Sequence, residues 1–176
     1  HRRGRHKGIA VMSVWVVDEA HARVHQGAMW HCSSLVTSLS DGASLDMVIT
    51  APTNDNPHMM MEAACGGDAE LLFYEGVLFS GGTTETVYNH KRTASDVWAG
   101  IVLTSPTITS TGTQLSVKFM PGGSHGQAQG SAQSFDQEWI IRNDSSYLLR
   151  LTNRSGSAKR ASLGCSHYSS PLVILG

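Results

Sequence analysis

Most of the chain consists of short runs in which apolar and polar residues alternate, interrupted by turn residues roughly every 8 to 12 positions. Such alternation is typical of strands that bury one face. Leu45, Met47 and Ile49, for example, alternate with polar or smaller neighbours until Pro52 ends the run. The pattern predicts strands at residues 20–25, 29–39, 45–50, 58–64, 70–74, 83–88, 100–104, 114–119, 138–142, 147–153 and 160–168.

Helix signals are weak, and only residues 93–98 could form a short helical turn. A parallel α/β sheet needs crossover connections of about a dozen residues or more, and the chain leaves no room for them. We therefore expect an all-β fold, a β-sandwich or jelly-roll-like single domain with an extended N-terminal arm; a barrel is the other architecture this pattern allows. The expected divisions are an arm at 1–19, the domain at 20–170 and an apolar tail at 171–176.

Composition narrows the classes of protein. The chain has 176 residues, of which 40% are hydrophobic and 15% charged, which excludes bulk disorder and suits one domain with a substantial core. Its net charge of -1 argues against a wholesale nucleic-acid binder. No apolar run approaches the roughly 20 residues that span a bilayer, so we expect no membrane partner.

Both ends of the chain carry candidate contact residues. The first seven positions hold four basic side chains, typical of an arm that binds phosphate or an acidic surface, and an apolar stretch follows. This stretch and the apolar tail predict contacts with a partner, although they could equally be a solvated terminus and edge strands of the domain itself. The candidates are Arg2, Arg3, Arg5, Lys7, Ile9, Val11, Val14, Trp15, Val17, Leu172 and Ile174.

A Gly/Ser/Gln-rich segment at 121–134 is too long for an ordinary hairpin, and loops of this kind are usually functional, mobile or ordered by a neighbour. Gly122, Gly123 and His125 are its predicted contact residues. The segment also matches G-x-S-x-G around Ser124, with Asp144 and His167 following in hydrolase order. No helix signal follows the serine, so a flexible glycine loop explains the match better than a nucleophile elbow.

Metal and redox chemistry have little support. Cys32, Cys65 and Cys165 are odd in number and far apart, which predicts buried, reduced thiols and synthesis in a reducing cytoplasm. His31, His58 and His167 could converge on a metal in a jelly roll, but no H-x-H pair occurs. His21 and His25 would be neighbours only on a helix. We expect neither a metal nor a cofactor.

Carboxylates and aromatic residues give no specific site either. Asp136, Glu138 and Glu75 have no independent reason to act as a glycosidase pair. Exposed aromatic side chains could form a platform for a sugar, but most of those available lie within alternating runs and are predicted to be core. They are Trp15, Trp30, Trp98, Trp139, Tyr74, Tyr88 and Tyr147.

A series of short motifs occurs in a fixed order over about residues 24–168. The motifs are VHQGAMW at 24–30, ITAP at 49–52, FYEG at 73–76, GT at 82–83 with YNHKR at 88–92, SPTITSTGT at 105–113, EWII at 138–141 and YLLRLTN at 147–153. Together they resemble a family of structural proteins of tailed bacteriophages, and the resemblance rests on the order of the motifs. Gln26 stands where the family has Glu, and residues 89–92 keep only the family's basic character.

The resemblance implies a β-rich, non-enzymatic virion component, with capsid decoration or cement as the expected role. Its expected partners are the major capsid protein and copies of itself in a dimer or trimer, on the capsid surface of a virion assembled in the host cytoplasm. Nucleic acid is expected at most through the basic arm. The alternatives are a tail protein, a receptor- or carbohydrate-binding β-module, and, least supported, a cupin-like metal enzyme or a hydrolase.

Overall fold

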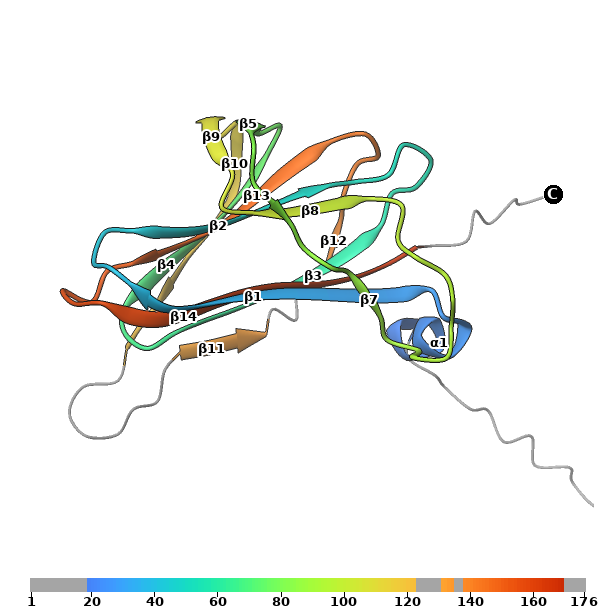
Figure 1. Cartoon of the computed structure of the whole chain (residues 1–176), viewed down its shortest axis with the longest axis horizontal. Helices are drawn as coiled ribbons and strands as arrows, with labels where there is room; N and C mark the ends of the chain where they lie inside the picture. The colour runs from blue at the N-terminus through green and yellow to red at the C-terminus, as the bar shows by residue number, and fades with distance from the viewer. Residues whose placement is uncertain (1–18, 123–130, 135–137, 170–176) are drawn as a thin grey trace, which may run out of the picture.

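The structure, a computed structural model, describes residues 19–122, 131–134 and 138–169 (Figure 1). Its strands form two six-stranded sheets that lie one above the other, and a small two-stranded sheet caps one of them. Every strand pair is antiparallel. The prediction of an all-β, sandwich-like domain is therefore confirmed.

The lower sheet in Figure 1 is built around three long strands, with β14 between β3 and β1. Short strands complete its two sides. Its members are β1 (Met29–Leu39), β3 (His58–Cys65), β7 (Tyr88–Asn89), β11 (Ser131–Ser134), β12 (Trp139–Ile140) and β14 (Lys159–Tyr168).

The upper sheet has the order β10-β4-β13-β2-β8-β6. Its members are β2 (Ser44–Thr50), β4 (Ala69–Glu75), β6 (Thr83–Thr84), β8 (Ile101–Thr104), β10 (Thr113–Met120) and β13 (Ser146–Asn153). The third sheet pairs β5 (Leu78–Ser80) with β9 (Thr107–Ser110).

The core lies between the two large sheets, as the alternation predicts. Met47 and Ile49 of β2 meet inward residues of the facing sheet such as Met59 and Leu163, all nearly inaccessible. Val48 and Leu148 point to the outer face of the upper sheet and are also buried. The small β5–β9 sheet covers them there with Phe79 and Ile108, together with the neighbouring Val77. The central strands of the upper sheet are therefore packed on both sides.

The strand predicted at 20–25 is wrong, because Glu19–Gln26 forms helix α1. Its alternating alanines suit a strand face, but Glu19 and Arg23 pair one helical turn apart with an N–O distance of 2.8 Å. The helical turn predicted at 93–98 is also wrong. No helix in the described chain has the length and apolar character to cross a membrane.

The run predicted as one strand at 83–88 is two strands. The chain leaves the upper sheet after β6, which pairs with β8, and reaches the lower sheet as β7, which pairs with β1 (Figure 1). Strands β5, β9 and β11 were not predicted. β11 lies in the Gly/Ser/Gln-rich segment and pairs with the open side of β3, so its partner rather than its own pattern determines the strand.

Candidate functional site

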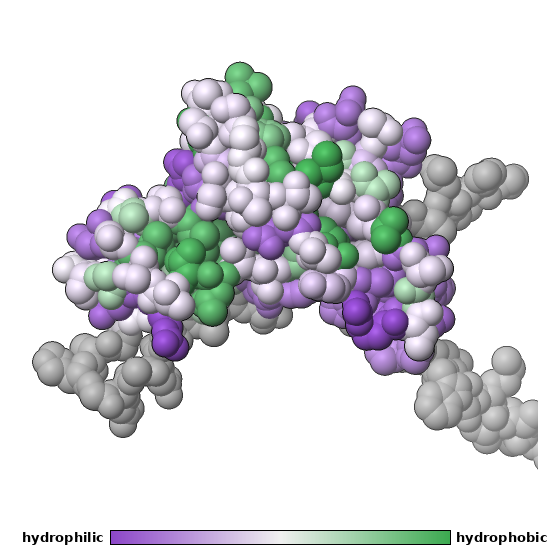
Figure 2. Space-filling view, viewed as in Figure 1, coloured by the Kyte–Doolittle hydropathy of each residue, from purple (hydrophilic) through white to green (hydrophobic). Residues whose placement is uncertain are grey.

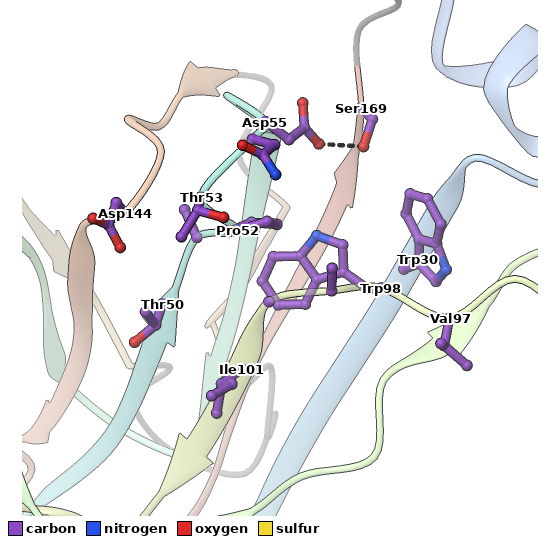
Figure 3. Close-up of a pocket in the computed structure, with 14 residues that line it drawn as sticks. Trp30, Thr50, Pro52, Thr53, Asp55, Val97, Trp98, Ile101, Asp144 and Ser169 are labelled. Carbon is purple, nitrogen blue, oxygen red and sulfur yellow. Dashed lines mark hydrogen bonds between the residues drawn. The ribbon is translucent and has the colours of Figure 1, made fainter.

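A pocket of about 460 Å³ opens at one end of the sandwich, where β2 and β14 end and β1 and β8 begin (Figure 3). The turn after β2 forms one wall, and the segment that leads into β8 forms the other. Its lining residues are Trp30, Thr50, Ala51, Pro52, Thr53, Asn54, Asp55, Val97, Trp98, Ala99, Gly100, Ile101, Asp144 and Ser169.

Two tryptophans line the inner part of the pocket, and the buried ring of His167 packs against both of them. Trp98 and Trp30 are 8% and 7% exposed, and His167 lies between them at 1%. The His167 ring centroid is 3.9 Å from that of Trp98 and 6.0 Å from that of Trp30. Burial, followed by the nearby charges of His31 and His90, lowers the pKa of His167 to about 3. The imidazole is therefore neutral at physiological pH.

Hydrogen bonding distinguishes the two indoles. Trp30 Nε1 donates to the carbonyl of Asp96 at 3.3 Å. Trp98 Nε1 is buried and has no hydrogen-bond partner, and neither ring nitrogen of His167 has one. Buried donors normally have a partner, so the Trp98 N–H is an unused polar group at the pocket. In Figure 3 its nitrogen is turned toward the side where Asp55 and Ser169 lie.

Gly100 lets the indole pack tightly. A Cβ at this position would lie 2.4 Å from two ring carbons of Trp98 and 2.7 Å from the Thr50 carbonyl oxygen. Any larger residue would displace the ring from β2. The pocket wall is therefore determined by a glycine that has no special backbone conformation.

The polar rim is held by bonds between the turn after β2 and the turn before β13. Asn143 makes two of these bonds. Its side-chain Nδ2 donates to the Thr53 carbonyl oxygen at 2.8 Å, and its backbone N–H donates to Asn56 Oδ1 at 2.9 Å. Ser169 Oγ donates to Asp55. Asp144 has a φ of 54°, a left-handed conformation that Asp and Asn tolerate better than most residues.

A second cluster lies on the outer face of the lower sheet. His31 Nδ1 is 3.1 Å from Ser166 Oγ, and its Nε2 is 3.5 Å from Glu62 Oε1, which arranges a hydroxyl, an imidazole and a carboxylate in a row. Acyl transfer also needs free N–H donors for the oxyanion. Because β14 is paired with β1 on one side and β3 on the other, the amides around Ser166 belong to the sheet ladder. The row alone does not make a hydrolase site.

The predicted hydrolase residues are not joined in the structure. Ser124 lies outside the described residues. Asp144 lies on an exposed turn, while both ring nitrogens of His167 are buried without a partner, so no hydrogen bond connects the two. Glu75 accepts a hydrogen bond from Tyr147 at 2.7 Å, and Glu138 pairs with His58 at 2.5 Å. Asp136 is outside the described residues.

The possible convergence of His31, His58 and His167 is wrong. His31 and His58 lie on the outer face of the lower sheet, in register with Ser166 and Tyr168, whereas His167 pairs with Trp30 on the inner face. Within the described ranges, no group of three or more His, Cys, Asp or Glu side chains could hold a metal ion. His21 and His25 are adjacent on α1, with their Nε2 atoms 3.0 Å apart.

The prediction of buried thiols is confirmed: Cys32, Cys65 and Cys165 are all buried, and none of them forms a disulfide. Cys32 and Cys165 are cross-strand neighbours whose sulfur atoms are 3.4 Å apart. Among the aromatic residues predicted to be core, Trp30, Trp98 and Tyr147 are buried, Trp139 and Tyr74 are half-buried, and Tyr88 is 54% exposed.

Most predicted contact residues lie outside the described residues. Of the loop candidates only Gly122 is described. Its N–H donates to Asp68 Oδ1 at 2.5 Å, and a Cβ there would lie 2.6 Å from the Asp68 nitrogen, so it joins β10 closely to the turn before β4. The others are Arg2, Arg3, Arg5, Lys7, Ile9, Val11, Val14, Trp15, Val17, Gly123, His125, Leu172 and Ile174.

Several residues of the short sequence motifs hydrogen-bond within the fold. Tyr147 accepts a hydrogen bond from the Arg142 N–H at 2.8 Å and donates to Glu75, which links two of the motifs. Asn89 donates to the Gly27 carbonyl at 2.6 Å, which links two others. Asn153 donates to the carbonyls of Leu39 and Ser157.

Sequence reasoning missed both the pocket and the row at His31. The sequence pattern shows only that the strand run ends at Pro52, and it predicts that Trp98 is core. The available signal was a tryptophan within a segment that has no regular alternation. No protein-family description matches the chain, and no curated protein matches it.

Proposed function

We propose that this chain is a non-enzymatic structural protein of a bacteriophage virion, a decoration or cement protein that binds the shell of the major capsid protein and stabilises the head. The observation that carries the proposal is the ordered series of motifs. Within these motifs Tyr147 donates to Glu75, and Asn89 donates to the Gly27 carbonyl. The resemblance therefore extends to residues that would preserve the family's scaffold.

The surface of the upper sheet supports a role in assembly. Val117 and Phe119 of β10 are 56% and 61% exposed and point to the same outer face, beside Leu72. Within the described chain β10 pairs only with β4, so it is an open edge that carries apolar side chains. Such an edge favours association unless a partner covers it.

The two ends of the described surface differ in character. In Figure 2 the end that carries α1 is largely hydrophilic, and hydrophobic surface gathers mainly nearer the other end. We propose that the apolar side meets the capsid shell and copies of this chain, in a dimer or trimer on the capsid surface. Repeated copies on a symmetric shell would turn weak single contacts into strong avidity.

The test is co-sedimentation with undecorated capsids of the phage that encodes the chain. We expect the full chain to sediment at a fixed ratio to the major capsid protein, and a variant lacking residues 1–17 to lose most of this binding. The double variant Val117→Ser/Phe119→Ser should bind at least tenfold more weakly. Leu35→Ser is the matched control, because Leu35 is 65% exposed on the other sheet.

A full chain that stays in the supernatant at all concentrations would overturn the proposal. Equal losses for the β10 double variant and for Leu35→Ser would overturn the assignment of β10 to the interface. Circular dichroism of each variant shows whether the sandwich remains folded.

A further inference from the structure

We propose that the pocket between the turn after β2 and the segment before β8 binds a neutral carbohydrate, such as the terminal residue of a glycan. This inference rests on the pocket alone and holds whether or not the chain belongs to a virion. Its volume of about 460 Å³ falls within the range of small-molecule sites, roughly 300 to 1,000 Å³.

The lining combines apolar surface with a few polar groups, as ligand sites usually do. Val97 and Ile101 are 83% and 51% exposed at the pocket, although both are large hydrophobic residues. A sugar ring presents C–H groups that can cover such surface while its hydroxyls remain free to hydrogen-bond. Pro52 extends the apolar lining (Figure 3).

The polar groups match hydroxyls. Asp55 accepts from Ser169, and a carboxylate has further acceptor positions. Asp144, Asn54 and Thr53 add acceptors and donors around the same opening. A purely apolar ligand would leave these groups unpaired.

Charge selects among sugars. Among the described residues that line the pocket, none is Lys, Arg or His, and the charged ones are Asp55 and Asp144. Two carboxylates without a cation disfavour phosphate, sulfate or sialic acid through like-charge repulsion. The preferred ligand is therefore neutral.

The site is also fixed before binding. Asn143 bonds the two turns of the rim together, and Gly100 holds the Trp98 ring against β2. A rigid pocket loses little conformational entropy when it binds a flexible glycan. These features separate the pocket from the row at His31, which lies on the face of a paired sheet.

The test is an array of neutral, sialylated and sulfated glycans probed with the labelled full chain, followed by titration of the best neutral sugar. We expect binding to neutral glycans and a change in tryptophan fluorescence that the Trp98→Phe variant reduces. Ala99→Trp, which fills the pocket from an exposed position, should weaken binding at least tenfold. Asp144→Asn should weaken it severalfold while the backbone keeps its left-handed conformation.

Asp96→Asn is the matched control, because Asp96 is exposed and does not line the pocket. The proposal is overturned if no neutral glycan binds at millimolar concentration, if only acidic glycans bind, or if Ala99→Trp and Asp96→Asn bind the sugar equally well. Failure of the chain to bind capsids would leave this result unaffected, so the two proposals can fail separately.

Discussion

His167 is a titratable side chain in the interior of the sandwich, and it lies against two indoles with no hydrogen-bond partner. One of its ring nitrogens carries a proton even in the neutral form, so the site buries an unpaired donor. Burial of such a group costs free energy unless a partner compensates it. His167 therefore destabilises the fold relative to an apolar ring of similar shape.

This placement makes stability depend on pH. The pKa of His167 is about 3 in the folded chain, and an unfolded histidine has a value near 6.5. The unfolded chain therefore binds the proton more readily than the folded chain. His167 leaves the free energy of unfolding independent of pH above about 6.5 and lowers it as pH falls from 6.5 toward 3. Its slope is about 1.4 kcal/mol per pH unit.

His167→Phe tests this. We expect the variant to equal or exceed the wild type in free energy of unfolding at pH 7, and its advantage to grow as pH falls from 6.5 to 4. Urea unfolding at several pH values gives the difference in free energy of unfolding between the variant and the wild type. The carboxylates affect both proteins equally, so their contributions cancel in this difference. A difference that stays constant with pH would contradict the assignment.

At the scale of elements, the turn between β9 and β10 depends on a glycine. Gly112 has a φ of 74°, and a Cβ there would lie 2.2 Å from the Glu75 carbonyl oxygen and 2.7 Å from that of Gly76. Gly42 has almost the same φ, 75°, but nothing lies within 4 Å of its Cβ position. Alanine substitutions at Gly42 and Gly112 therefore distinguish the cost of backbone strain alone from the cost of strain plus steric overlap.

We expect Gly42→Ala to lower the free energy of unfolding by on the order of 1 kcal/mol, the cost of the left-handed conformation alone. Gly112→Ala should cost about 3 kcal/mol or more, because overlap with two carbonyl oxygens forces β4 and β10 apart. Denaturant unfolding of the two variants gives the comparison. Equal losses would show that the β4–β10 connection tolerates the extra atom.

The elements also show what the sequence determines. Alternating runs predicted β1, β3 and β14 closely, because these strands have one face in the core. The runs of β2 and β13 were also predicted closely, although both faces of these strands are packed. Residues 19–26 satisfy both a strand and a helix pattern, and the pairing of Glu19 with Arg23 favours the helix. The sequence does not show that the 83–88 run forms two strands, because tertiary structure decides which sheet each half joins.

The pocket was not predictable for the same reason. Its walls come from segments far apart in the chain, at 50–55, 97–101, 144 and 169. The alternation that places Ile49 in the core says nothing about the loops beyond Thr50. The tightness around Trp98 depends on where Gly100 meets β2, which only the assembled sandwich determines.

At the scale of the whole molecule, a two-sheet scaffold carries an apolar open edge at β10 and, at one end of the sandwich, a pocket lined by two carboxylates. The pocket lies where β2 ends and β8 begins, and the exposed residues of β10 lie across the sheet order from β8. The surface proposed to meet the shell and the pocket proposed to bind a ligand therefore lie apart.

The most direct test of the central claim is quantitative mass spectrometry of density-gradient-purified particles of the phage that encodes the chain. We expect the chain to occur in a constant, symmetry-compatible ratio to the major capsid protein in every particle fraction. Its absence from intact particles, while it is abundant in the soluble lysate, would contradict the assignment to the virion.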